Sequence, residues 1–172
     1  MINFLDISYL KSGNKKQQKA YQVLITHKIM EKLSAYTPIL VGTIPINIDI
    51  ESSDLDIICY VKDKTEFIET STNCFQKEKG FIICQNLKLN SIKANFYIDD
   101  FEFEIFGQDK ETIQQNAFRH MIIEYKLLLE KGENFRQEII KLKKQGLKTE
   151  PAFAKLLGLE GNAYEEILKL EF

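Results

Sequence analysis

Hydrophobic and polar positions change from helical to strand spacing within the first hundred residues of the chain. Apolar residues recur every three or four positions from Asn14 to Tyr36, which predicts a helix. It ends before Pro38, because proline disfavours helical backbone in the residue preceding it. A weaker helical pattern covers residues 63–78, and 43–53 reads as a loop. Apolar runs bounded by turn residues predict strands at Ile39–Val41, Asp54–Val61, Gly80–Leu89, Lys93–Ile98 and Phe101–Phe106.

Beyond Gly107 the spacing of apolar residues is helical to the end of the chain. Glycine commonly follows the last turn of a helix, and proline is tolerated in the first turn. These signals predict helices at Lys110–Lys131, at Glu133–Gln145, from Thr149 to a stop at Gly158, and from a cap at Asn162 through Leu170. We therefore predict an α+β architecture in one domain over 1–172, with a mixed α/β core over about 1–108 and a helical part over about 109–172.

Composition and charge narrow the class of protein. The 172 residues, 44% hydrophobic and 28% charged, suit one folded domain, and a net charge of -2 disfavours a strongly basic nucleic-acid binder. The run Lys15, Lys16 and Lys19 is typical of a solvated face, with attraction of phosphate as the alternative. The three cysteines lack the spacing of a metal site or a disulfide framework. With no apolar segment of membrane-spanning length and no signal-peptide pattern, we expect a cytoplasmic protein without a membrane partner.

Two aspartates form the first candidate site. Asp54 and Asp56 are two residues apart on a predicted strand, so both side chains leave the same face. Two like charges held this close repel each other unless something compensates them, and Mg²⁺ bound through carboxylates does so. The alternative is a solvated strand entrance following Ser53.

The neighbouring segments add groups that suit phosphate chemistry. Gly42 ends the preceding strand and lets a phosphate approach the backbone, while the hydroxyl of Thr43 can hold its oxygens. Strict alternation over residues 101–105 projects Glu102 and Glu104 from one face of a later strand. A third carboxylate there would complete a two-metal phosphoryl-transfer site, and the alternation alone leaves the choice between the two glutamates open.

These residues carry a resemblance to a known superfamily. Gly42-Thr43, followed after ten residues by Asp54-Leu55-Asp56, resembles the signature of the nucleotidyltransferase (DNA polymerase β-like) superfamily, although Thr43 stands where serine is usual. Further segments resemble a small bacterial family of that superfamily known as a domain of unknown function (DUF4269-like): Gly42–Pro45, Ser53–Ile57, Glu104–Gln108, Gln115–Met121 and Thr149–Phe153. The match at Glu104–Gln108 favours Glu104 over Glu102 as the third acid.

The resemblance implies a nucleotidyltransferase-like mixed sheet with flanking helices, and an enzyme that transfers NMP from an NTP to an acceptor hydroxyl on a small molecule, RNA or protein. It implies that Asp54, Asp56 and Glu104 hold Mg²⁺ or Mn²⁺, and that Glu104 accepts the proton of the attacking hydroxyl. The alternatives are a nucleotide-binding or protein-interaction module without turnover, and a nucleotide phosphoanhydride hydrolase. The residues that would hold the triphosphate are Gly42, Thr43 and Ser53.

The predicted helix over 110–131 offers further candidate contacts for a nucleotide. Gln115 and Arg119 are four residues apart and share a face, as do His120 and Glu124. The forked guanidinium of Arg119 matches phosphate oxygens, so we predict that Gln115, Arg119 and His120 contact the nucleotide. A solvated polar face with a His120–Glu124 pair is the alternative.

Overall fold

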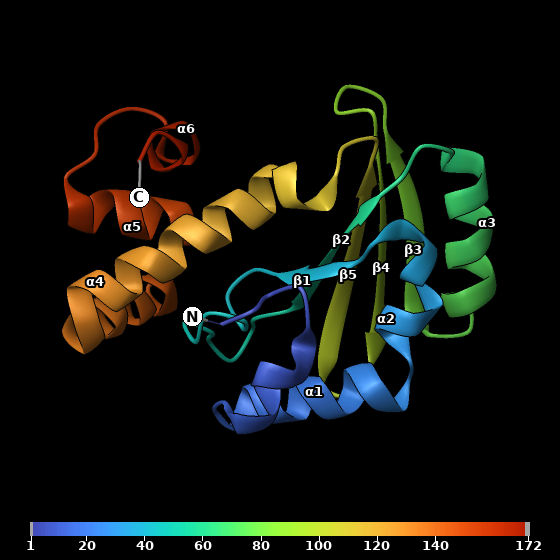
Figure 1. Ribbon diagram of the computed structural model, residues 1–172, viewed down its shortest axis with the longest axis horizontal. Coiled ribbons are helices and arrows are strands. Elements are labelled where there is room, and N and C mark those ends of the chain that lie inside the picture. The colour runs from blue at the N-terminus through green and yellow to red at the C-terminus, as the bar shows by residue number, and fades with distance from the viewer. Residues whose placement is uncertain (1, 171–172) are drawn as a thin grey trace.

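Five strands form one mixed sheet in the computed structural model, which describes residues 2–170 (Figure 1). Their order across the sheet is β1-β2-β5-β4-β3; β2 and β5 are parallel, and the other neighbouring pairs are antiparallel. The predicted strands are confirmed to within a few residues. Their bounds are Ile39–Val41 (β1), Leu55–Tyr60 (β2), Lys79–Asn86 (β3), Ser91–Ile98 (β4) and Phe101–Gln108 (β5).

Helices cover the sheet in two groups on opposite sides (Figure 1). The first group is α1 (Lys15–Thr26), α2 (Ile29–Lys32) and α3 (Lys64–Phe75), with 3-10 turns at Ile7–Ser12 and Ser34–Tyr36. The second is α4 (Asn116–Lys144), α5 (Thr149–Leu157) and α6 (Ala163–Leu168), preceded by a 3-10 turn at Thr112–Gln114. The predicted α+β architecture with a helical C-terminal half is confirmed.

The alternation along β2 and β5 assigns each side chain to one of these two sides. On β5, Phe101, Phe103 and Ile105 are buried in the core shared with α1, α2 and α3. Glu102 and Glu104 therefore leave the opposite face, which is the side of α4, α5 and α6. On β2, Leu55, Ile57 and Cys59 likewise face the first core, so Asp56 shares the face of the β5 glutamates.

Two predicted helices differ from the observed ones. The helix expected over 14–36 is broken, because Lys28 adopts a left-handed backbone with φ 53°, and the chain restarts so that Ile29 and Leu33 are fully buried. The helix expected from Lys110 starts instead at Asn116. Its predicted stop at Gly132 is confirmed as a non-helical kink with φ 78°, and the helical stretch beyond it, to Lys144, matches the helix predicted over Glu133–Gln145. The predicted stop at Gly158 and the cap at Asn162 are confirmed.

The structure also describes two features that the composition raised: the cysteines and the length of the apolar helices. Cys59, Cys74 and Cys84 are all free thiols. Among the helices within residues 2–170, none combines the length and the apolar character required to cross a membrane.

Candidate functional site

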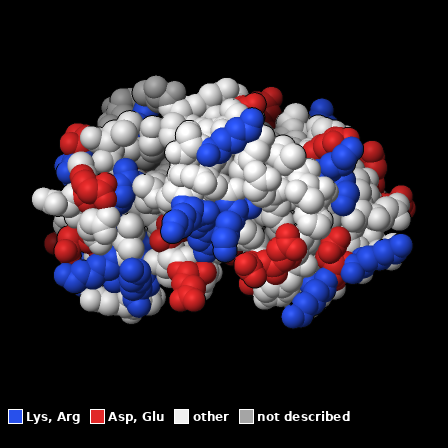
Figure 2. All heavy atoms as spheres, turned by 90° about the horizontal axis from the view of Figure 1, so that it is seen from below, with Lys and Arg blue, Asp and Glu red and all other residues white. Residues whose placement is uncertain are grey.

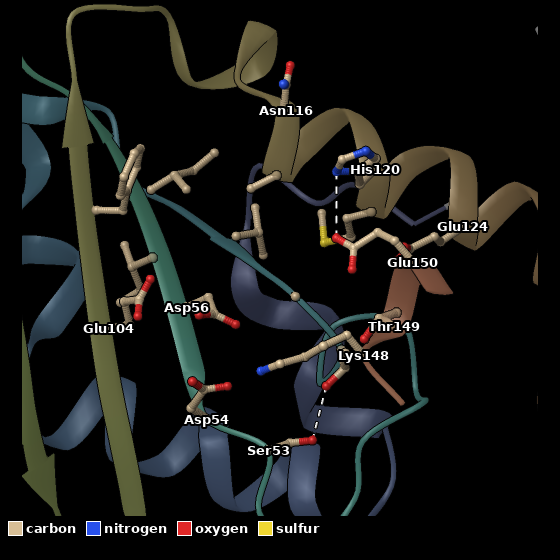
Figure 3. A pocket seen from close by; sticks show the side chains of 18 of the residues that line it. Ser53, Asp54, Asp56, Glu104, Asn116, His120, Glu124, Lys148, Thr149 and Glu150 are labelled. Atoms are coloured by element: carbon tan, nitrogen blue, oxygen red, sulfur yellow. Dashed lines mark hydrogen bonds and ion pairs between the residues drawn. The ribbon is translucent and has the colours of Figure 1, made fainter. Parts of the chain in front are cut away.

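Strand register brings the predicted carboxylates to one place. Asp56 pairs with Val41 on β1 and with Glu104 on β5, so Asp56 and Glu104 are direct neighbours across the sheet. Asp54 immediately precedes β2 and points to the same side (Figure 3). These three side chains line a cavity of about 940 Å³ between the sheet and the helices α4 and α5. The upper end of the usual range for small-molecule sites is about 1,000 Å³, so the cavity is large.

Glu102, the alternative third acid, lies outside the cavity lining. It pairs with Tyr97 on β4, and a hydrogen bond with Glu102 raises the pKa of the Tyr97 phenol. Of the two glutamates on this face of β5, only Glu104 lines the cavity within the described residues.

Gly42 lies directly against the carboxylate of Asp56. A Cβ atom at position 42 would be 2.5 Å from Oδ2 of Asp56, and the backbone there has a φ of +86°, which side chains rarely adopt. Both observations require glycine at this position. The glycine of the predicted motif therefore leaves room for the Asp56 carboxylate.

Thr43 and Ser53 line the cavity beside the two aspartates. The Thr43 hydroxyl donates a hydrogen bond of 3.1 Å to Oγ of Ser53, which also accepts one of 2.9 Å from the Ile50 amide (Figure 3). These bonds close the loop over 43–53, so the segment joining β1 to β2 is held in a fixed shape next to the carboxylates.

The carboxylates on β2 are poorly compensated by the protein itself. Burial, followed by the charges of Asp54, Glu104 and Glu150, raises the pKa of Asp56 to about 8. Burial also raises the pKa of Asp54, with a further contribution from Glu104. A divalent cation would remove this repulsion, and carboxylate oxygens are ligands that Mg²⁺ prefers.

Glu104 is held away from a metal-binding arrangement. Its Oε2 is 3.0 Å from Nζ of Lys93, which projects from the neighbouring strand β4. Residues 2–170 contain no group of three His, Cys, Asp or Glu side chains already arranged to hold a metal ion. Asp54, Asp56 and Glu104 have the right chemistry for Mg²⁺, and Lys93 would compete with a cation for the Glu104 carboxylate.

The residues predicted on the helix after β5 have different surroundings. Gln115 is 1% exposed, and its Nε2 donates bonds of 2.9 Å to the carbonyls of Cys59 and Lys110, which ties the start of α4 to the end of β2. Arg119 is exposed and is not among the residues that line the cavity. The structure brings Gln115 and His120 into the cavity lining and leaves Arg119 outside it.

His120 does not pair with Glu124 as the spacing suggested. Its Nε2 is 2.7 Å from the carbonyl oxygen of Tyr164 in α6, and its Nδ1 is 3.7 Å from Oε1 of Glu150 in α5 (Figure 3). Residues four apart on a helix share a face, but here α5 and α6 pack against that face and supply stronger partners.

Sequence reasoning assigned no role to the lysines that line the cavity among the described residues, which are Lys110, Lys143, Lys144 and Lys148. Lys143 and Lys148 are the two whose surroundings bear on the carboxylates. Lys143, near the end of α4, is buried, and its Nζ donates a bond of 2.8 Å to the carbonyl of Ile48; burial lowers its pKa to about 8. Lys148, just before α5, extends toward Asp54 and Asp56 (Figure 3), and its charge partly offsets the raised pKa of Asp54. Both belong to a lysine-rich helix end, so no sequence signal separates them from solvated neighbours.

Two lysines of the basic run on α1 contact other parts of the protein. Lys16 donates bonds of 2.7 and 2.9 Å to the carbonyls of Ile50 and Glu51, and Lys19 lies 3.8 Å from Asp100. Figure 2 shows the face on which α1 lies, where basic and acidic side chains are interspersed. This face therefore lacks the uniform positive charge typical of a nucleic-acid surface.

Comparisons with known proteins give a family match and a fold match. The model of the family described as Domain of unknown function (DUF4269) matches residues 22–170. No curated protein matches the chain.

Similar solved structures are Cid1 poly(U) polymerase with bound Mg 3'-dATP, a GLD-2/RNP-8 complex, and the polymerase core of TRAMP, an RNA surveillance complex. Cid1 matches with a TM-score of 0.59 and 11% identity over 90% of this chain. The GLD-2/RNP-8 complex matches with 0.56 and 14% over 81%, and the TRAMP polymerase core with 0.55 and 11% over 94%. The chain spans 48%, 56% and 50% of their lengths. At these identities the likeness concerns the fold.

Proposed function

We propose a function from one premise: the chain belongs to the family described as Domain of unknown function (DUF4269) and has the fold of the nucleotidyltransferase superfamily. It transfers NMP from an NTP to an acceptor hydroxyl, with residues 1–172 acting as one unit. The observation that carries this proposal is the pairing of Asp56 with Glu104 on neighbouring strands, with Gly42 directly after β1 against Asp56, beside a cavity of about 940 Å³.

In the proposed reaction, the acceptor oxygen attacks the α-phosphorus, the bond to the bridging oxygen breaks, and pyrophosphate leaves. Asp54, Asp56 and Glu104 would hold Mg²⁺ or Mn²⁺, which neutralises triphosphate charge when bound. Gly42 leaves the backbone open to the phosphates, and the hydroxyls of Thr43 and Ser53 lie beside it. The lysine side chains on α4 and α5 add positive charge, so the protein acts by positioning and electrostatics.

Proton removal from the acceptor is assigned to Glu104. Its carboxylate lies next to Asp56 across the sheet, at the edge of the same cavity. Release from Lys93 would free this carboxylate both to approach the cation and to accept the proton. Gln115, Arg119 and His120 are proposed only as residues of the helix that borders the nucleotide, because Gln115 and His120 already have partners within the protein.

A second candidate is a module that binds nucleotide without turnover. The 3.0 Å ion pair between Lys93 and Glu104 favours it, because an acid held by a lysine neither binds a cation nor accepts a proton as readily. A Lys93→Gln variant separates the two candidates: transfer increases if the pair only restrains an active Glu104.

The test is incubation with α-labelled NTPs, Mg²⁺ or Mn²⁺ and a metabolite extract as a source of acceptors. We expect a labelled product with the wild type and a loss of about a thousandfold with Asp56→Asn, since metal charge supplies several kcal/mol to such reactions. Glu130→Gln, an exposed position on α4, is the control. Free NMP would indicate a hydrolase, whereas NTP-dependent stabilisation without any product would indicate a binding module.

A further inference from the structure

A second pair of acids lies on the helical side of the cavity. Glu124 projects from α4 and Glu150 from α5, and Figure 3 shows both on the helical side of the cavity, with the Glu150 carboxylate pointing toward His120. Both line the same cavity as the aspartates. We call Glu124 and Glu150 the helix acids, and Asp54, Asp56 and Glu104 the strand acids.

Glu124 is deeply buried and incompletely satisfied. It is 3% exposed, and within residues 2–170 its Oε1 atom is buried without a hydrogen-bond partner. An unpaired polar atom in a protein interior costs about 1–3 kcal/mol, so such atoms normally have a partner. The unpaired acceptor at the cavity wall is therefore suited to a donor from a ligand.

The cations near Glu124 and Glu150 do not fully compensate the negative charge that these two acids carry when ionised. Burial, followed by the charge of Glu150, raises the pKa of Glu124 to about 8, so below this pH the acid holds a proton that it would release when an ammonium group supplies the compensating charge. Lys143 is the cation that opposes this effect, but its ammonium group donates to the carbonyl of Ile48. His120 approaches Glu150 only at 3.7 Å, and its other nitrogen is taken by Tyr164.

We propose that the helix acids bind a protonated amine on the acceptor, so that the acceptor is a small hydroxyl-bearing amine. The inference rests on the proposed function, because the strand acids then take the metal and triphosphate. The cavity volume, near the upper end of the range for ligand sites, leaves room for two substrates.

An ammonium group suits the helix acids better than a metal ion does. It offers three donors that can be shared between two carboxyl groups, and an amine does not require a complete ligand shell from the protein. His120, which could supply a further metal ligand beside the two acids, is already engaged with the carbonyl of Tyr164.

The test measures binding without nucleotide or metal, so it is independent of turnover. Glucosamine and 1,2-diaminoethane are titrated into the protein, with glucose and ethanediol as uncharged counterparts. The ionic strength is the same in all titrations and is kept in the tens of millimolar. We expect amide chemical shifts of α4 and α5 to move with the amines only. Glu124→Gln should weaken amine binding about tenfold, in line with a charged hydrogen bond.

Three variants make the result specific. Glu130→Gln, on the same helix but exposed, should bind the amines as the wild type does. Asp56→Asn should keep amine binding and lose Mg²⁺-dependent binding of NTP, whereas Glu124→Gln should do the reverse. If Asp56→Asn left Mg²⁺-dependent binding of NTP unchanged, the result would count against the proposed function. The amine titrations could still be interpreted, because they contain neither nucleotide nor metal.

Several results would overturn the proposal. They are equal binding of amines and uncharged counterparts, absence of binding by both amines, and unchanged amine binding by Glu124→Gln. A loss of NTP affinity in Glu124→Gln with amine binding intact would also do so, because Glu124 would then face the nucleotide.

Discussion

The strand acids and the helix acids line one cavity but are positioned in different ways. Asp54 and Asp56 are two residues apart, and pairing of β2 with β5 places Glu104 beside Asp56. Glu124 and Glu150 come from separate helices, and only the packing of α4 against α5 brings them together. Strand alternation and sheet pairing therefore fix the first group, whereas the second depends on the packing of helices.

After the loss expected from Asp56→Asn, the largest effect is expected from Gly42→Ala, which disturbs the strand acids through the backbone. Its Cβ would displace the Asp56 carboxylate, from which it is separated by 2.5 Å. A misplacement of about 1 Å can cost about a hundredfold in rate, so transfer should fall by about that factor. Labelled-product assays with saturating NTP measure it.

Gly158→Ala is the matched control for that variant. Gly158 also has a positive φ, +67°, but a Cβ added there would meet no atom within 4 Å beyond its own helix and chain neighbours, and it is not a cavity residue. Both variants should lose a similar stability, about 1 kcal/mol or somewhat more, from the strained backbone. Equal loss of transfer in both would show that backbone strain, and not the Asp56 contact, is responsible.

The next effect concerns stability and the helix acids. The folded-state pKa of Glu124, about 8, lies above its usual 4.5, so the folded protein holds a proton that the unfolded chain has lost between these values. Unfolding free energy should therefore fall as pH rises through this window, by at most about 1.4 kcal/mol per pH unit. Glu124→Gln removes this contribution and should be more stable than the wild type at pH 8, with little difference at pH 5.

Urea unfolding in a chelator without amines measures the two curves. Asp56 titrates in the same direction in both proteins, so its contribution cancels in the difference. Parallel curves for the wild type and Glu124→Gln across pH 5 to 9 would contradict a buried, uncompensated Glu124. Glu130→Gln should follow the wild type throughout.

A smaller effect is expected from Lys148→Gln, which acts between the two groups of acids. Lys148 is exposed and extends toward the strand acids, so its charge should assist triphosphate binding (Figure 3). We expect about a fivefold rise in the Kd for Mg²⁺–NTP at low salt, with the difference disappearing at high salt because exposed charges are screened. Lys155→Gln, exposed on α5, is the control; equal effects would indicate only a general charge contribution.

The smallest effect is expected from Arg119→Gln. Arg119 is exposed and is not among the cavity-lining residues, and surface substitutions usually change free energies by less than about 0.5 kcal/mol, or about twofold in affinity. NTP titration by thermal shift tests it. A tenfold weaker affinity would support the sequence-based hypothesis that Arg119 holds the triphosphate, and would require α4 to shift when nucleotide binds.

The sequence predicted much of the strand side of the cavity and little of its helical side. Period-two alternation identified the outward-facing Asp56 and Glu104, and the break at Gly42 marked the end of β1. The spacing of His120 and Glu124 gave a false partner, because helix periodicity states which residues share a face but not what packs against it. Thr149 and Glu150 were read only as a helix start.

The amino-acid sequence by itself determined the strands, most helices and the side of the sheet on which the acids lie, because alternation and glycine or proline signals act over a few residues. Tertiary structure alone decided that Lys93 engages Glu104, that Lys143 and Lys148 reach the cavity, and that Glu124 and Glu150 line it together. These contacts join segments distant in the chain, and their free energy depends on burial and packing that no local pattern records.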